Sequence, residues 1–141
     1  MNKIDNFIKF ISINIGLITI SDSRNEENDK SGNLLKEKIN NFGHIVYKKI
    51  IIKDDLDLIK KTISDLAKDN KIDAIITTGG TGLTGRDSTP EAIIEMADKI
   101  IDGFGELFRQ LSYEKIGTST IQSRAVAGII NNTYIFSLPG S

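Results

Sequence analysis

The chain has 141 residues and a formal net charge of −1, and it contains no cysteine. Its basic residues are interspersed with acidic ones, so no basic stripe indicates binding to nucleic acid or to an anionic membrane. The lack of cysteine excludes disulfides, thiolate nucleophiles and thiolate metal sites, and the length predicts a single domain over residues 1–141. We expect a cytoplasmic protein, because polar residues interrupt the apolar N-terminus too often for a signal peptide.

The first elements expected in the chain are two strands separated by a helix. Residues 13–20 are predicted to form one strand and residues 46–52 the next, whose consecutive isoleucines indicate an inner strand. Between them, Ser31 is expected to cap a helix that continues to about Asn41 and stops at a glycine. The only histidine, His44, follows that glycine, and we expect a surface or capping role for it.

A pair of acidic residues, Asp54 and Asp55, opens the next expected helix. Apolar residues at helical spacing continue this helix to about Lys68. Both carboxylates suit the positive N-terminal end of a helix, so helix capping is one interpretation. A carboxylate site at the end of a strand is the other, and the residues alone favour capping.

The segment from Thr77 to Glu91 carries most of the candidate chemistry in this sequence. It follows an apolar run at 72–76 that suits a buried strand, and it leads into a helix expected from Pro90. Ser88 and Glu91 have the spacing of a capping box. The sequence therefore predicts a strand, a glycine-rich loop and a helix in succession.

The glycines at positions 79, 80, 82 and 85 suit this loop to phosphate binding. They permit positive φ and leave backbone N–H groups uncovered, as an anion-binding loop requires. The N-terminus of the following helix adds partial positive charge, so we expect phosphate at the carboxyl edge of a parallel sheet. Asp87 would repel phosphate unless a cation lay between them. We therefore interpret Asp87 as a Mg²⁺ ligand, with an acidic helix cap as the alternative.

Two nucleotide-binding motifs match this loop only in part. Residues 80–85 have the form G-x-G-x-x-G, but a dinucleotide fingerprint opens the first strand-to-helix turn, and this segment follows the third expected strand. The same glycines match the start of a P-loop, yet Arg86 and Asp87 stand where Lys and Ser or Thr are required. We therefore assign the chain to neither class.

The last third of the chain is predicted to contain two helices and a final strand. A short helix is expected over residues 106–111, after a break at 103–105, and small residues favour a tightly packed helix over 125–130. Before it, Arg124 could bind phosphate or form a structural salt bridge. Residues 133–138 suit a strand. Strands alternating with helices imply an α/β fold with a mostly parallel sheet.

The polar segments that follow the expected strands should meet at one edge of such a sheet. They are residues 21–24, 53–55, 77–87 and 139–141. Because the carboxyl ends of parallel strands share an edge, we expect the functional site there.

Four motifs occur in order between about residue 13 and the end of the chain. They are Thr78-Gly79-Gly80-Thr81-Gly82, Asp87-Ser88-Thr89-Pro90-Glu91-Ala92, Ile121-Gln122-Ser123-Arg124-Ala125-Val126-Ala127-Gly128 and Leu138-Pro139-Gly140-Ser141. Together they resemble the MoaB/MogA family of molybdenum cofactor biosynthesis. Two further segments are similar to its MoaB branch: Gly103-Phe104-Gly105-Glu106 and Ile116-Gly117-Thr118-Ser119-Thr120.

This resemblance implies a three-layer α/β/α fold of the molybdopterin-binding type and the activity of a molybdopterin adenylyltransferase. In that reaction the terminal phosphate of molybdopterin attacks the α-phosphate of ATP with Mg²⁺ present, and pyrophosphate leaves. Such a transfer depends on positioning and charge neutralisation, so a site without cysteine or histidine is suitable. The alternative is a molybdopterin-binding or assembly module of the same pathway that does not catalyse turnover.

By the same resemblance, Asp54 and Asp87 are expected to be catalytic residues and Mg²⁺ ligands, which reverses the capping interpretation of Asp54. The residues expected to bind the ligands are Thr78, Gly79, Gly80, Thr81, Gly82, Ser88, Thr89, Ser123, Arg124, Pro139 and Gly140. The resemblance also implies a homotrimer or hexamer. In the family, a C-terminal helix follows the Pro-Gly motif, and this sequence does not contain it.

Overall fold

The computed structural model describes residues 8–83 and 87–140 and contains a six-stranded sheet in the order β2-β1-β3-β6-β5-β4. Four neighbouring strands are parallel: β2 (Ile45–Ile52), β1 (Asn14–Ile20), β3 (Ala74–Thr78) and β6 (Thr133–Leu138). The strand β5 (Val126–Ile130) is antiparallel to both β6 and β4 (Lys99–Ile100). The predicted α/β fold with a mostly parallel sheet is therefore confirmed.

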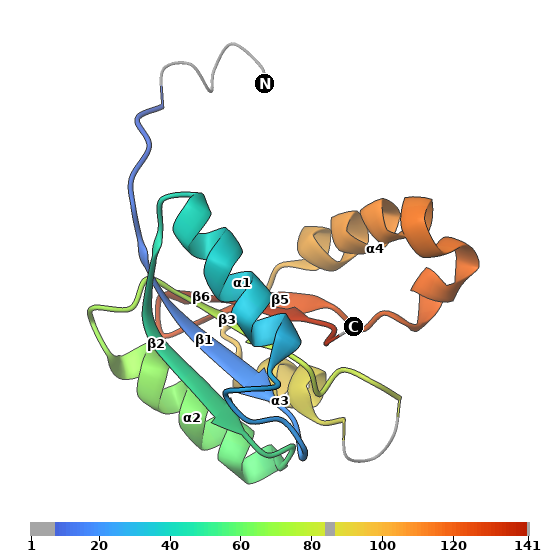
Figure 1. Cartoon of the computed structure of the whole chain (residues 1–141), viewed down its shortest axis with the longest axis horizontal. Helices are drawn as coiled ribbons and strands as arrows, with labels where there is room; N and C mark the ends of the chain where they lie inside the picture. Colours follow the sequence, from blue (N-terminus) through green and yellow to red (C-terminus); the bar gives the residue numbers. More distant parts are fainter. Residues whose placement is uncertain (1–7, 84–86, 141) are drawn as a thin grey trace.

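Helices cover both faces of this sheet, which gives the expected three-layer arrangement (Figure 1). The helices α2 (Leu56–Lys68) and α3 (Thr89–Met96) lie on one face, whereas α1 (Lys30–Asn41) and α4 (Asp102–Ile116) lie on the other (Figure 1). A short 3₁₀ helix, η2 (Gly117–Gln122), follows α4. Within the described ranges, none of the helices has the length and apolarity needed to span a bilayer.

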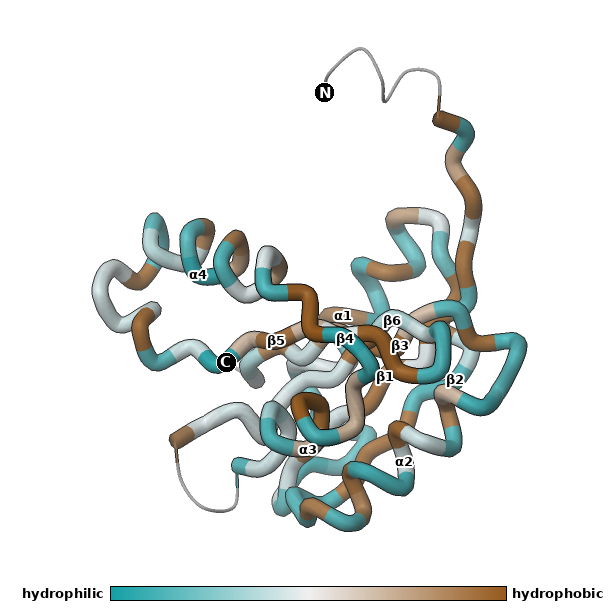
Figure 2. The backbone as a smooth tube through the Cα atoms, turned by 180° about the vertical axis from the view of Figure 1, so that it is seen from behind, coloured by the Kyte–Doolittle hydropathy of each residue, from teal (hydrophilic) through white to brown (hydrophobic). Residues whose placement is uncertain are grey.

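The larger core lies between the sheet and the layer of α2 and α3. Its centre consists of isoleucines that are completely shielded from solvent: Ile18, Ile59, Ile63, Ile75, Ile93 and Ile135. Burying one such side chain contributes about 1.5–3 kcal/mol. Hydrophobic and hydrophilic residues alternate along α2, as expected for a helix with one buried face (Figure 2). This core fixes β3, the strand that leads into the glycine-rich loop.

On the opposite face, a buried aspartate joins α1 to the sheet. Asp29 is fully buried and accepts hydrogen bonds from Thr19 Oγ1 at 2.7 Å, Lys49 Nζ at 2.9 Å and Gly32 N at 3.1 Å. Burial raises the pKa of Asp29, but the hydrogen bonds and the Lys49 charge outweigh it and leave the pKa below its ordinary value. The N-cap of α1 is thus Asp29, so the predicted cap at Ser31 is wrong.

Three expectations about the elements are wrong. Most of the helix expected over residues 125–130 is instead the strand β5 (Val126–Ile130), because the Asn131-Asn132 pair, with φ of 49° and 65°, turns the chain directly into β6. The strand β2 lies at the edge of the sheet. Helix α4 begins at Asp102 and continues through Gly105, where a Cβ would lie only 2.9 Å from the Ala125 carbonyl oxygen. This glycine permits close packing and does not break the helix.

The predicted capping box of α3 is not formed. Its N-cap residue Ser88 makes no side-chain capping hydrogen bond, and Glu91 pairs with Arg124. His44 has a structural role, since its Nδ1 accepts a hydrogen bond from Ile13 N at 3.2 Å. Because Ile13 precedes β1, His44 lies at the amino end of the parallel strands, opposite the glycine-rich loop.

Candidate functional site

The polar segments that follow the parallel strands meet at one edge of the sheet, as predicted. Asp54 N, which follows β2, donates to Asp22 Oδ1, which follows β1, at 3.2 Å. Gly79 N, after β3, donates to Leu138 O at the end of β6 at 3.1 Å. These hydrogen bonds connect segments that are far apart in the sequence and place the candidate site at the carboxyl ends of four strands.

Two glycines make the turn that leaves β3. Gly79 and Gly80 have φ of 93° and 66°, which residues with a Cβ rarely adopt. A Cβ at Gly79 would overlap the Ile20 carbonyl oxygen, and one at Gly80 would overlap Thr89 Oγ1. Thr89 is fully buried, and its backbone N–H donates to Gly80 O at 3.0 Å. The start of α3 is therefore tied to the glycine turn, as an anion-binding loop requires.

A polar cavity of about 330 Å³ opens beside this turn. The lining residues are Gly79, Gly80, Thr81, Gly82, Asp87, Gln122, Ser123, Arg124, Pro139 and Gly140. The structure thus gathers most of the expected ligand-binding residues, which come from three separate segments. Among the expected residues outside this lining, Thr78 donates to Pro139 O at 3.4 Å and Thr89 lies beneath the turn. The last glycine expected in the loop, Gly85, lies outside the described residues.

The two expected catalytic acids have different surroundings. The carboxylate of Asp87 lies against Gly82, where an added Cβ would stand 2.5 Å from Asp87 Oδ2. Asp54 is buried, and its Oδ1 accepts a hydrogen bond from Ser88 N at 3.3 Å. The cap of α2 is Asp55, which accepts from Leu58 N at 2.9 Å. Asp54 is therefore not the cap of α2; it is hydrogen-bonded to the residue after Asp87, but it is not among the residues that line the polar cavity.

Of the two roles left open for Arg124, the structure contains the salt bridge. Its Nη1 and Nη2 atoms bind the Glu91 carboxylate at 2.7 and 2.9 Å. Nη2 also donates to Asp87 O at 2.7 Å, and Nε donates to Thr81 O at 3.2 Å. Sequence reasoning missed this pairing, because it had assigned Glu91 to the capping box.

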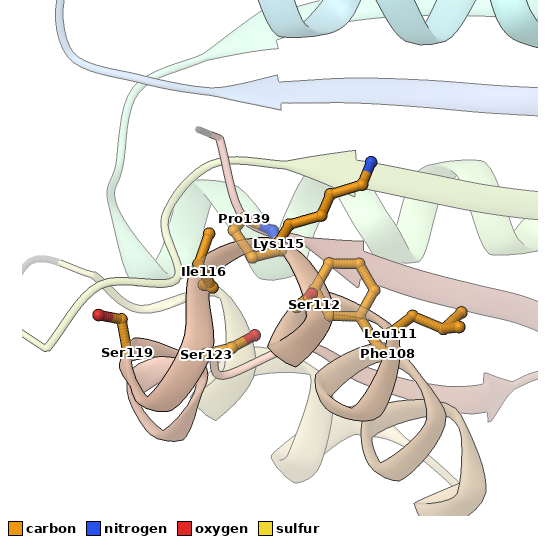
Figure 3. Close-up of a pocket in the computed structure, with 8 residues that line it drawn as sticks. All are labelled: Phe108, Leu111, Ser112, Lys115, Ile116, Ser119, Ser123 and Pro139. Atoms are coloured by element: carbon orange, nitrogen blue, oxygen red, sulfur yellow. The ribbon is translucent and has the colours of Figure 1, made fainter.

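A second, larger and mostly apolar cavity has a volume of about 520 Å³ (Figure 3). Residues of α4, η2 and the chain end line it: Phe108, Leu111, Ser112, Lys115, Ile116, Ser119, Ser123 and Pro139. Its size is in the range of small-molecule sites. Ser123 and Pro139 belong to both cavities, and Ser123 Oγ is buried without a hydrogen-bond partner among the described residues.

Sequence reasoning did not find this apolar cavity. The positions 108, 111, 112 and 115 have the spacing of one helix face and could have indicated it, but the helix was expected to end at residue 111. The helix instead continues to Ile116 and extends the cavity wall.

A glycine-rich turn at the carboxyl edge of a parallel sheet, beside an apolar cavity, defines an α/β domain suited to an organic phosphate ligand. Residues 16–141 match the family described as "Probable molybdopterin binding domain", and the chain belongs to this family.

Curated relatives support this assignment with similarity over most of the chain. Molybdenum cofactor biosynthesis protein B of Escherichia coli strain K12 is 45% identical over 133 residues, which cover 94% of this chain and 78% of that protein. The protein of the same name from Bacillus cereus is 48% identical over 126 residues, which cover 89% of this chain and 75% of that protein. These similarities confirm the resemblance to the MoaB/MogA family.

Solved structures share the fold. A crystal structure of Molybdenum cofactor biosynthesis protein B is similar with a TM-score of 0.90 and 45% identity, covering 93% of this chain and 82% of that chain. The tungsten cofactor synthesizing protein MoaB of Pyrococcus furiosus is similar with a TM-score of 0.82 and 40% identity, covering 92% of this chain and 83% of that chain. The expected MoaB/MogA-like fold is therefore confirmed.

Proposed function

We propose that this protein acts in molybdenum cofactor biosynthesis and transfers the adenylyl group of ATP to molybdopterin with Mg²⁺ present. Relatives named for that pathway support the assignment to it. One observation carries the proposal: a polar cavity around glycine-rich backbone shares the lining residues Ser123 and Pro139 with an apolar cavity of about 520 Å³. Molybdopterin has the matching chemistry, because it joins a flat ring system to a phosphate.

In this proposal the two cavities bind different parts of molybdopterin. The backbone N–H groups of the glycine-rich turn and the N-terminus of α3 bind phosphate oxygens. Phe108 and Leu111 supply apolar surface for the ring system. The Ser123 hydroxyl, which has no hydrogen-bond partner among the described residues, accepts or donates a hydrogen bond where the cavities join.

The transfer forms one P–O bond and breaks another. An oxygen of the molybdopterin phosphate attacks the α-phosphorus of ATP, and the bond to the bridging oxygen breaks as pyrophosphate leaves. The attacking oxygen is already anionic, so the protein need not supply a nucleophile or a base. The protein has to align the two phosphates, and this alignment can remove a large part of the activation barrier of the transfer.

Asp87 and Asp54 would hold the Mg²⁺ ion. Among the described residues no group of three or more His, Cys, Asp or Glu side chains could hold a metal ion. Mg²⁺ commonly takes only one or two carboxylates together with substrate phosphates, so the two acids fit it. When bound, Mg²⁺ supplies neutralisation of the negative charge on the phosphates. The hydrogen bond from Ser88 N connects Asp54 to the residue that follows Asp87.

Pyrophosphate release with ATP, Mg²⁺ and molybdopterin tests this function in the wild-type chain and in Asp87→Ala. We expect transfer by the wild type and none by the variant, and thermal unfolding should show that the variant is folded. The exposed Asp57 offers a control, and Asp57→Asn should retain full activity. Undiminished transfer by Asp87→Ala would contradict the assignment of Asp87. Molybdopterin binding without pyrophosphate release by the wild type would instead establish the non-catalytic module.

A further inference from the structure

We infer that Arg124 is a positioning residue that fixes both ends of the glycine-rich loop, with Glu91 orienting its guanidinium, and that it is not a direct phosphate ligand. This inference rests on the proposed function, because it concerns how Asp87 is held for Mg²⁺.

The contacts of Arg124 leave it little capacity for a ligand. Nε donates to Thr81 O at 3.2 Å, Nη1 to Glu91 Oε2 at 2.7 Å, and Nη2 to both Glu91 Oε1 at 2.9 Å and Asp87 O at 2.7 Å. A guanidinium has five N–H donors, so about four are engaged. Bidentate binding of a phosphate requires two, and the guanidinium would have to release a loop carbonyl or Glu91 first.

These contacts set the separation of two points on the loop. Thr81 lies in its first part and Asp87 in its last, and both carbonyl oxygens accept from the same planar group. The guanidinium is rigid, so its Nε and Nη2 atoms hold the two carbonyls at a fixed distance. The backbone of Asp87 is thereby fixed. This also fixes the position from which the Asp87 side chain extends, and its carboxylate is the group proposed to hold Mg²⁺.

Glu91 makes this arrangement possible. It lies in the first turn of α3, and its two oxygens bind Arg124 in the bidentate geometry that fixes orientation as well as distance. The side chains of Arg124 and Glu91 are 29% and 49% exposed. Ion pairs with this exposure contribute little to global stability, so loss of the pair should change the site without unfolding the chain.

Glu95 provides a matched control on the same helix. Its Oε2 binds Lys60 Nζ at 2.6 Å, in an ion pair between α3 and α2, and Glu95 is not among the residues that line the polar cavity. Glu91→Gln and Glu95→Gln therefore remove the same charge from the same helix, and only the first disturbs Arg124.

The experiment measures ATP binding by equilibrium dialysis in the wild type, Arg124→Lys, Glu91→Gln and Glu95→Gln. Each protein is measured once with a chelator that removes Mg²⁺, and separately over a series of Mg²⁺ concentrations. We expect the half-saturating Mg²⁺ concentration to rise by about 10- to 100-fold in Arg124→Lys and Glu91→Gln, the usual effect of losing a group that orients a metal ligand. Without Mg²⁺, the affinity for ATP should stay within about twofold of the wild type in all three variants. Thermal unfolding confirms that each is folded.

Three results would overturn the inference. If Arg124→Lys bound ATP about tenfold more weakly than the wild type in the absence of Mg²⁺, Arg124 would be a direct phosphate ligand. If the Mg²⁺ dependence of ATP binding were unchanged in Glu91→Gln, Glu91 would not be needed to orient Arg124. If ATP binding by the wild type did not depend on Mg²⁺, Asp87 would not hold Mg²⁺ for ATP. Failure of the proposed function looks different: ATP binding would depend on Mg²⁺ as expected, but no pyrophosphate would be released.

Discussion

Gly82→Ala is predicted to displace the Asp87 carboxylate while leaving the fold intact. Gly82 is exposed, and it is not among the glycines with positive φ, so alanine meets no backbone strain there. The added Cβ would lie 2.5 Å from Asp87 Oδ2 and 2.8 Å from its Cγ. The obstacle is thus the end of one side chain, which can move away.

The size of the displacement follows from these distances. Ordinary van der Waals contact begins near 3.4 Å, so the Asp87 oxygen at 2.5 Å must move by about 0.9 Å. A misplacement of about 1 Å can lower the rate of a positioned reaction by about 100-fold. Stability should hardly change, or rise by up to about 1 kcal/mol because alanine restricts the unfolded chain.

Pyrophosphate release and urea unfolding measure the two effects separately. Gly103→Ala is the matched control, since a Cβ at Gly103 in α4 has no neighbour within 4 Å. Both variants should unfold at urea concentrations equal to or above that of the wild type, and only Gly82→Ala should lose activity. Full activity in Gly82→Ala would refute the claim that the carboxylate beside Gly82 must be held in place.

Three further predictions concern the turn, the buried aspartate and the apolar cavity. Gly79→Ala should lower the free energy of unfolding by about 1–3 kcal/mol, because it combines a φ of 93° with overlap of a backbone oxygen; unchanged urea unfolding would be inconsistent with this geometry. Asp29→Asn should lower the free energy of unfolding by about 3–5 kcal/mol at pH 7, since it leaves the Lys49 ammonium without the carboxylate that pairs with it. The pKa of Asp29 is lowered from 3.8 in the folded protein, so its contribution is complete above that pH and is lost as pH falls through the folded-state value. The difference in free energy of unfolding between the wild type and Asp29→Asn, measured in urea, should therefore become smaller below about pH 3.8. A difference that stays constant with pH would contradict the pairing of Asp29 with Lys49. Ser112→Trp should fill part of the apolar cavity and raise the Kd for molybdopterin about tenfold or more, the equivalent of about 1.4 kcal/mol of lost contact, as measured by calorimetric titration.

The strand, loop and helix around the candidate site could be predicted because their signals are local. The apolar run before Thr77, the glycines and Pro90 each specify their own conformation, and the observed β3 and α3 follow them closely. The edge position of β2 could not be predicted, since the composition of a strand does not state which strands will pair with it. Residues 125–130 were misassigned because a short run of small apolar residues suits both helix and strand.

The residues of the polar cavity were largely expected, but their interactions were not. Glu91 and Arg124 are 33 residues apart, and only the folded chain brings them together. The same holds for Asp54 and Ser88, which are separated by 34 residues. Sequence spacing identifies local caps such as Asp55, whereas pairs that depend on the sheet topology require the structure.

The central claim is that this site transfers an adenylyl group, and a single-turnover reaction tests it most directly. Wild-type protein in excess over ATP labelled at the α-phosphate is mixed with molybdopterin and Mg²⁺, and the products are separated. We predict that the label moves into adenylyl-molybdopterin with one pyrophosphate released for each transfer, and that chelation of Mg²⁺ stops the reaction. Label that remains in ATP while molybdopterin is bound would contradict the account and leave a binding module in its place.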